Sequence, residues 1–195
     1  LLEALHAVAA RRDGGSSYLR LSTRPVDQGL LPVSQAPAQR DSLRRAVLSG
    51  AHRVLAQETS MVTIAACGVM VPEAIAAARQ LLEDDVSAEV VSVTSPGRLY
   101  RGYQRAQYQG VRDVSRGGRA RPWSHSAFEG KDSPIVTVID GHPHTLAWLP
   151  GALGRQGAAL GVTGFGRSGT SSDLYREFAI DSEAIVAAAV SLLDR

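Results

Sequence analysis

Apolar residues gather in a few short runs that have the length of β-strands. Residues 61–67 and 134–140 are apolar without alternation, which is typical of strands covered on both faces in the middle of a parallel sheet. Residues 88–94 and 158–163 form two further runs of strand length. The pattern therefore predicts at least four strands that share one buried sheet.

Helical periodicity fills the intervals between these runs. After the first run, Gly68 predicts a turn, and Pro72 fits the first turn of a helix whose apolar stripe contains Ile75 and Leu81. Near the end of the chain, Ser171 or Ser172 is expected to cap a helix at residues 173–178, and Asp181 one at 181–193. The other expected helices are residues 1–10, 99–108 and 145–153.

Strands that alternate with helices indicate the α/β class. The order strand, helix, strand between residues 61 and 94 forms one βαβ unit, which places its two strands in parallel. We therefore expect a three-layer α/β/α domain with a mostly parallel five-stranded sheet.

The first part of the chain has a weaker pattern. Residues 17–22 alternate like a half-buried strand, and residues 45–50 and 53–56 read as a short strand or hairpin. Residues 23–39 contain three prolines and no sustained period, which indicates an interdomain linker. Because the chain opens inside a predicted helix, we expect it to be a piece of a longer protein.

Composition narrows the class of protein. The 195 residues are 44% hydrophobic and 21% charged, which fits a globular domain with its own core. The single cysteine, Cys67, excludes an intramolecular disulfide framework, fits a reducing cytoplasmic setting and is expected to be buried and inert. No apolar stretch reaches the ~18 residues of a membrane span, so no membrane partner is expected.

Arginine is abundant, with 20 arginines against Lys131 alone, although the formal charge is only +2. Residues 98–123 hold seven arginines and three tyrosines, and Asp113 is the one acid among them. This segment can be interpreted as a nucleic-acid surface, as a docking surface for an acidic partner, or as a solvated insertion. Since no nucleic-acid-binding motif accompanies it, we expect no nucleic-acid partner.

A glycine-rich turn raises the possibility of nucleotide binding. Residues 164–169 satisfy G-x-G-x-x-G, follow a predicted strand and precede a helix. The dinucleotide-binding motif also requires a following strand that ends in an acidic residue, whereas only helices are predicted after Gly169. We therefore expect a structural turn, formed by Gly164, Phe165, Gly166, Arg167 and Ser168, and keep a dinucleotide-binding domain as an alternative.

The same turn carries a family resemblance. The sequence LGVTGFGRSG at residues 160–169, followed by DLYREFAID at 173–181, resembles the closing segment of transketolase-superfamily proteins. It is similar above all to the homodimeric decarboxylating component of pyruvate dehydrogenase, which carries an F-G-R-S turn before its last helices. The resemblance covers residues 44–195, and it assigns residues 1–28 to the end of a preceding pyrimidine-binding domain and residues 29–43 to a linker.

The resemblance implies a function for the parent enzyme. Such enzymes decarboxylate a 2-oxo acid on thiamine diphosphate and pass the acyl group to a lipoyl acyltransferase subunit. Their thiamine diphosphate and Mg²⁺ are held by upstream domains through a G-D-G motif, which this sequence lacks. The chain is then expected to stabilise a homodimer and to carry no catalytic residue or cofactor alone. A transketolase-type ketol transferase domain remains an alternative.

Three residues are candidates for the edge of an active site. His142 and His144 follow the predicted strand at 134–140, and the carboxyl ends of strands are where open α/β sheets bind ligands. No third ligand lies nearby in the sequence, so no metal site is expected. Arg24 resembles the position where transketolases keep an arginine for the sugar phosphate. The two histidines depart from the pattern of the pyruvate enzymes, which leaves the 2-oxo acid open.

Overall fold

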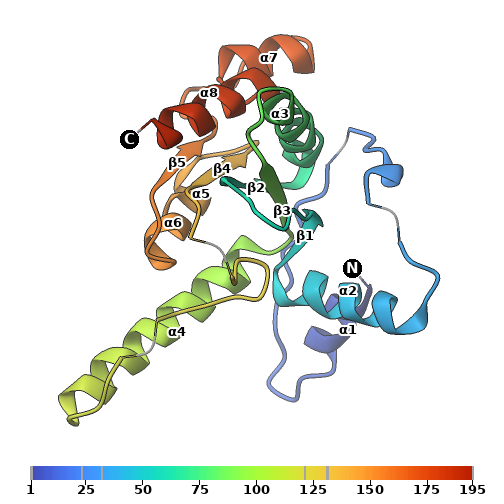
Figure 1. The fold of residues 1–195 in the computed structure, drawn as a ribbon. Helices are drawn as coiled ribbons and strands as arrows, with labels where there is room; N and C mark the ends of the chain where they lie inside the picture. Colours follow the sequence, from blue (N-terminus) through green and yellow to red (C-terminus); the bar gives the residue numbers. More distant parts are fainter. Residues whose placement is uncertain (1, 23, 32, 121, 131, 195) are drawn as a thin grey trace.

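A five-stranded sheet forms the centre of the computed structural model, which describes residues 2–22, 24–31, 33–120, 122–130 and 132–194. The strand order is β1-β3-β2-β4-β5 (Figure 1). The strands β2, β3, β4 and β5 run parallel, and β1 pairs antiparallel with β3 at one edge. The strand bounds are β1 Ala51–Leu55, β2 Val62–Cys67, β3 Ala88–Val93, β4 Ile135–Ile139 and β5 Gly157–Leu160. The predicted fold class is confirmed.

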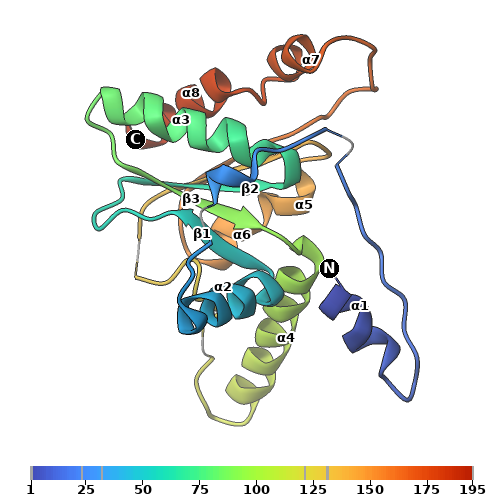
Figure 2. The same ribbon diagram turned by 90° about the vertical axis from the view of Figure 1, so that its right-hand side faces the viewer.

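Helices cover both faces of this sheet. The helices α3 (Val71–Glu83) and α8 (Ser182–Leu193) pack together on one face, where Figure 2 shows them side by side. The other face is covered by the start of α4 (Pro96–Ser115), by α5 (His144–Ala147) and by α6 (Leu149–Ala152). Two apolar clusters result, one on each side of the strands, as a three-layer α/β domain requires.

The apolar runs explain why the central strands are where they are. In β2 and β4 all but the last residue of β2 are buried, so side chains on both faces of these strands are covered. A strand covered on both faces has no polar side to alternate with, which is why its sequence reads as a continuous apolar run. The predicted strands at 61–67, 88–94, 134–140 and 158–163 are confirmed, with ends shifted by at most three residues.

The sequence reading of residues 45–50 as a strand is wrong. These residues complete α2 (Pro37–Ser49), which packs against β1 and ends at Gly50, a left-handed residue with φ of +117°. Pro37 in the first turn and Gly50 just past the end are typical boundaries of a helix. Only residues 53–55 of the predicted hairpin belong to a strand, the edge strand β1.

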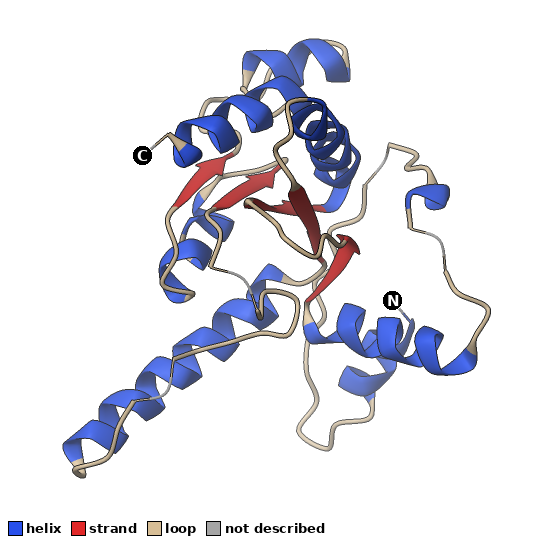
Figure 3. Ribbon diagram, viewed as in Figure 1, coloured by secondary structure: helices blue, strands red, loops and turns tan. Residues whose placement is uncertain are grey.

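The predicted strand at residues 17–22 is also wrong. After α1 (Leu2–Ala9) the described chain runs as loop to the short helix η1 (Gln28–Leu30) (Figure 3). Tyr18 in this loop is 89% exposed. An isolated strand leaves its backbone groups without partners, and no described strand lies beside this segment to pair with it. Alternation alone was therefore insufficient evidence.

The helix α4 is twice as long as its sequence pattern predicted. It spans Pro96–Ser115 rather than residues 99–108, and its far half projects from the body of the molecule, with the following loop returning alongside it (Figure 1). Other helix boundaries differ less. The predicted helix at 145–153 is divided into α5 and α6, and α7 (Ser171–Glu177) is capped by Thr170, not by Ser171 or Ser172. No described helix combines the length and apolar character of a bilayer span.

Candidate functional site

The strand order creates a switch point between β2 and β4. The chain leaves β2 through η2 (Gly68–Met70) and α3 to reach β3 on one side, whereas β4 lies on the other side of β2. Connections after neighbouring strands that depart in opposite directions open a crevice at the carboxyl edge, where open α/β sheets bind ligands. The loops after Cys67 and after Ile139 border this point, so residues in these loops are the first candidates for a functional site.

Arg20 reaches this edge from the N-terminal segment. Its Nη2 donates a hydrogen bond to the carbonyl oxygen of Asp140, directly after β4. A side chain at Gly141 would meet the same guanidinium, since an added Cβ would lie 2.8 Å from Nη1 of Arg20. Sequence reasoning had not singled out Arg20, because a contact across 120 residues leaves no local signal. The guanidinium is the one cation shown bonded to the β4 loop among the described residues.

Cys67 ends β2 beside this guanidinium. Its thiol is free and half-buried. Burial raises the pKa of the Cys67 thiol, and the charge of Arg20 offsets part of that rise. A thiol held protonated is a poor nucleophile, which agrees with the expected inert character of this cysteine.

The two candidate histidines lie together just past β4. The rings of His142 and His144 are 4.6 Å apart in an edge-to-face arrangement, and the backbone N–H of His144 donates to Nδ1 of His142 at 3.4 Å. Both side chains are exposed. Among the described residues no group of three histidine, cysteine, aspartate or glutamate side chains is placed to hold a metal ion. The pair therefore offers imidazole groups to a ligand from outside rather than a closed metal site.

Arg24 lies elsewhere. Its guanidinium stands over the ring of Tyr175 in α7, 5.7 Å from the ring centre. A cation over an aromatic face is stabilised by the ring quadrupole, so this contact gives Arg24 a structural explanation. The structure brings His142 and His144 together at the switch point, and it joins Arg20 rather than Arg24 to that edge.

The glycine turn is an open loop. Phe165 at its tip is 96% exposed, and Arg167 forms an ion pair with Glu177 of α7. Neither Gly164 nor Gly166 has positive φ, and an added Cβ at Gly166 would meet nothing within 4 Å. Open space beside Gly166 means that close packing does not require a glycine at this position. In the described chain, the elements after the turn are the helices α7 and α8, so the strand of a dinucleotide motif does not follow.

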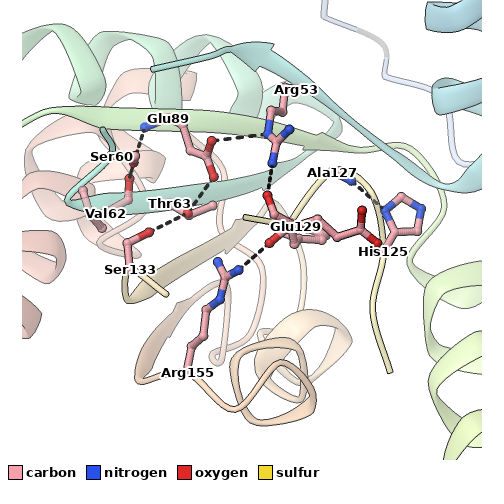
Figure 4. A network of polar contacts seen from close by, with 11 residues as sticks. Arg53, Ser60, Val62, Thr63, Glu89, His125, Ala127, Glu129, Ser133 and Arg155 are labelled. Carbon is pink, nitrogen blue, oxygen red and sulfur yellow. Dashed lines mark hydrogen bonds and ion pairs between the residues drawn. The ribbon is translucent and has the colours of Figure 1, made fainter. Parts of the chain in front are cut away.

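The opposite edge of the sheet carries a buried acid that the sequence reading overlooked. The side chain of Glu89, at the start of β3, is 1% exposed and accepts a hydrogen bond from Thr63 Oγ1 at 2.9 Å (Figure 4). Its other oxygen lies 3.3 Å from Nε of Arg53 in an ion pair. Thr63 also contacts the hydroxyl of Ser133 at 3.1 Å, which links β2 to the loop before β4.

Two arginines extend this network to the loop after α4. Arg53 Nη2 donates to the carbonyl of Glu129 at 2.7 Å, and Arg155 Nη2 donates to the carbonyl of Phe128 (Figure 4). Burial lowers the pKa of Arg155, opposed by the charges of Asp132 and Glu89. Because Glu89 and Thr63 lie at the amino ends of β3 and β2, away from the switch point, we interpret the network as structural.

A cluster of aromatic side chains, called the aromatic cluster below, packs against the first turns of α4. Trp123 and Trp148 pack with Tyr100 and Tyr103 of α4, the ring of Tyr103 stacking on Trp148 at 5.3 Å. His125 continues the contact: its Nδ1 accepts from Ala127 N at 3.2 Å, so Nε2 carries the proton and donates to Ser49 Oγ at 3.0 Å. Burial lowers the pKa of His125 and favours this neutral ring.

Comparisons with known proteins agree with this architecture. The profile of the transketolase-like TK C-terminal domain family matches residues 50–181. The pyruvate dehydrogenase E1 component of Mycobacterium tuberculosis is 33% identical over 170 residues, and the chromosomal transketolase of Cupriavidus necator is 31% identical over 186 residues. These alignments cover 83% and 95% of this chain, but only 18% and 23% of the relatives.

The solved transketolase from Leishmania mexicana has a similar fold. It superposes with a TM-score of 0.54 at 23% identity, over 77% of this chain and 19% of that one. At this identity the likeness shows the fold alone. The chain thus spans about a fifth of the length of the proteins that it resembles.

Proposed function

Because this chain belongs to the transketolase-like C-terminal domain family, we propose that it is the C-terminal domain of a thiamine-diphosphate-dependent 2-oxo acid dehydrogenase that acts in the cytoplasm. The observation that carries the proposal is the 33% identity to a pyruvate dehydrogenase E1 component over most of the chain. The resemblance noted in the sequence to the transketolase superfamily is confirmed by the family match. The 2-oxo acid that we propose is pyruvate.

The proposed role of the chain is assembly rather than chemistry. Thiamine diphosphate would supply the electron sink for decarboxylation, bound with Mg²⁺ by upstream domains of the same enzyme. This chain would stabilise the homodimer and help to form the entrance to the active site, and a lipoyl acyltransferase subunit would accept the acyl group. His142 and His144 are proposed to line that entrance from the switch-point edge, because they are exposed there. Arg24 stays a proposed entrance residue on its sequence position alone, since its guanidinium lies over Tyr175 and not at the switch-point edge.

The proposed domain boundaries gain one refinement. We keep residues 1–28 as the end of a pyrimidine-binding domain and residues 44–195 as the C-terminal domain. The proposed linker at 29–43 overlaps α2, which packs against β1 of the sheet. Residues 37–43 are therefore better assigned to the C-terminal unit.

The proposal is tested by comparing the chain alone with the same chain joined to upstream thiamine-binding domains. The 195-residue chain, given thiamine diphosphate and Mg²⁺, is expected to bind neither and to leave pyruvate unchanged. The same chain joined to upstream thiamine-binding domains is expected to bind the cofactor in calorimetry and to decarboxylate pyruvate. Decarboxylation by the chain alone would contradict the proposal, as would failure of the joined enzyme to bind the cofactor.

A second candidate is a transketolase-type ketol transferase. The alignment to the chromosomal transketolase covers 95% of this chain, more than the 83% covered by the pyruvate enzyme. The joined enzyme decides between them when it is assayed with pyruvate plus a lipoyl acceptor and, separately, with a ketose phosphate plus an aldose phosphate. Turnover of the sugar phosphates without pyruvate decarboxylation would establish the second candidate.

A further inference from the structure

A hollow of about 310 Å³ lies between the N-terminal segment and the β1 edge of the sheet. Residues 26–28, Leu30, Leu31 and Val33 form one wall. Residues of β1 and β3 and the starts of η2 and α3 form the other. Figure 2 shows the blue N-terminal segment crossing beside the sheet before it continues to α2. This volume lies at the lower limit of small-molecule sites, so the hollow fits a compact ligand.

His52 is the unusual residue of this hollow. It lies on β1 opposite Ser92 of β3, and it is only 6% exposed. Both ring nitrogens are buried without a hydrogen-bond partner among the described residues. Burial lowers the pKa of His52, which keeps the ring neutral. A buried polar group without a partner is destabilising, and a ligand that bonds to the imidazole recovers the lost interaction.

The start of a helix borders the same hollow. Gly68 and Val71 line it, where η2 continues directly into α3, and no side chain caps this start. The acid in the first turn, Glu73, is occupied elsewhere, since its Oε2 accepts from Ser182 N at 3.2 Å. Free N–H groups and the helix dipole favour a negative group at this end. At Gly68, with φ of +62°, an added Cβ would meet nothing within 4 Å, so the space is open.

The remaining walls define the rest of the ligand. Leu30 and Val54 face the hollow from opposite sides and offer an aliphatic lining. Asp27 also borders it, but its carboxylate accepts from Gly29 N at 2.8 Å and caps η1. The hollow therefore combines one buried imidazole, one helix start and an apolar wall.

We propose that this hollow binds a small monocarboxylic acid with an aliphatic tail. The carboxylate lies between His52 and the start of η2, and the tail packs against Leu30 and Val54. Both ring nitrogens of His52 are buried, so binding turns the ring or moves η1 outward. This inference goes beyond the proposed function and does not rest on it, because it concerns the β1 edge and not the reaction of the parent enzyme.

The test titrates 4-methylpentanoate into the 195-residue chain and follows the ¹⁵N resonances of the histidine rings. We expect a saturable shift of the His52 resonances and a rise in the unfolding temperature, since a ligand that binds only the folded state stabilises it. Acetate lacks the tail and 4-methylpentanamide lacks the charge, so each is expected to give at least a tenfold weaker response. No His52 shift at 4-methylpentanoate concentrations of about 10 mM would overturn the proposal.

Variants separate the site from general acid binding. His52→Phe keeps an aromatic ring at this position, removes both unpaired nitrogens and is expected to fold while losing the response. His6→Gln, which changes an exposed histidine of α1, is the control and should keep it. If His52→Phe fails to fold, the comparison of acid and amide on the unaltered chain still decides. An equal response to the amide would contradict the proposed binding of a carboxylate. An unchanged response in folded His52→Phe would show that the imidazole is not part of the site, which also overturns the proposal.

Discussion

At the scale of single residues, the most informative side chains are polar or charged groups that are buried in the core. Glu89 is a charged residue inside the strand pattern of residues 88–94, and its burial is possible because Thr63 and Arg53 contact its two carboxylate oxygens. A sequence pattern indicates that such a residue is in a strand. It does not reveal the partners, which come from other strands.

The buried carboxylate should matter for stability. Glu89→Gln leaves Arg53 without its counter-charge, and an unpaired buried charge is destabilising. Because the Arg53 side chain is 32% exposed and partly solvated, we expect a loss of about 2 kcal/mol rather than the larger cost of a fully buried pair. Urea unfolding measures the difference. The control Glu177→Gln removes the exposed ion pair with Arg167 and should cost less than about 0.5 kcal/mol. Equal losses in the two variants would contradict the structural role of Glu89.

Two buried histidines predict a pH dependence of folding. Burial lowers the pKa of both His52 and His125 in the folded chain. The unfolded chain then binds more protons at low pH, so stability is full above the unfolded value of about 6.5 and falls as the pH drops through it. Urea midpoints at about pH 8 and about pH 5.5 measure this fall. The double variant H52F/H125F should show a smaller fall, whereas His6→Gln should leave it as in the unaltered chain.

At the scale of elements, the sequence was most informative where one residue or a continuous run determines the structure. The central strands follow from uninterrupted apolar runs, and the start of α8 follows from Asp181, whose side chain accepts from Ala184 N at 3.0 Å. The helix α2 was missed because its arginines obscure any apolar stripe, although Pro37 and Gly50 mark both its ends. Residues 17–22 were assigned wrongly because pairing, not alternation, makes a strand.

The start of α7 gives a test at this scale. Thr170 Oγ1 accepts from Asp173 N at 3.3 Å and is the cap, although the sequence pointed to Ser171 or Ser172. Thr170→Ala should therefore destabilise the chain by about 1 kcal/mol, and Ser171→Ala should have almost no effect. Chemical denaturation of the two variants makes the comparison. A larger loss in Ser171→Ala would mean that the helix begins one residue later than described.

At the scale of the whole molecule, the sheet topology explains why the site was only partly predictable. The histidines after β4 could be predicted, because a residue just past the carboxyl end of a strand has a known place in a parallel sheet. Arg20 could not be predicted, because it contacts Asp140, which is 120 residues away in the sequence. That contact depends on how the N-terminal segment lies over the edge of the sheet. The hollow beside His52 could not be predicted from the sequence either, because it forms only where the segment with η1 packs beside β1.

The projecting part of α4 gives the last prediction. Beyond its aromatic base, the helix packs on its own returning loop, where Gly110 lies against Ala120, while Tyr108 and Val111 remain about 70% exposed. This projecting part, residues 107–118 and called the arm below, buries little apolar surface and should therefore contribute little to the free energy of folding. Replacing residues 107–118 by Gly-Ser-Gly-Ser should therefore change the free energy of unfolding by less than about 1 kcal/mol and keep unfolding cooperative.

The matched control for the arm lies at its base. Leu99→Ala alters a side chain that is buried between α4 and the sheet, and it should cost about 2–5 kcal/mol. Calorimetric unfolding of both variants compares the arm with the base directly. If the shortened chain is the less stable of the two, the arm is part of the folding core. The opposite order would show that Leu99 and the aromatic cluster anchor α4, and that folding does not depend on Arg112 and Arg116 of the projecting part.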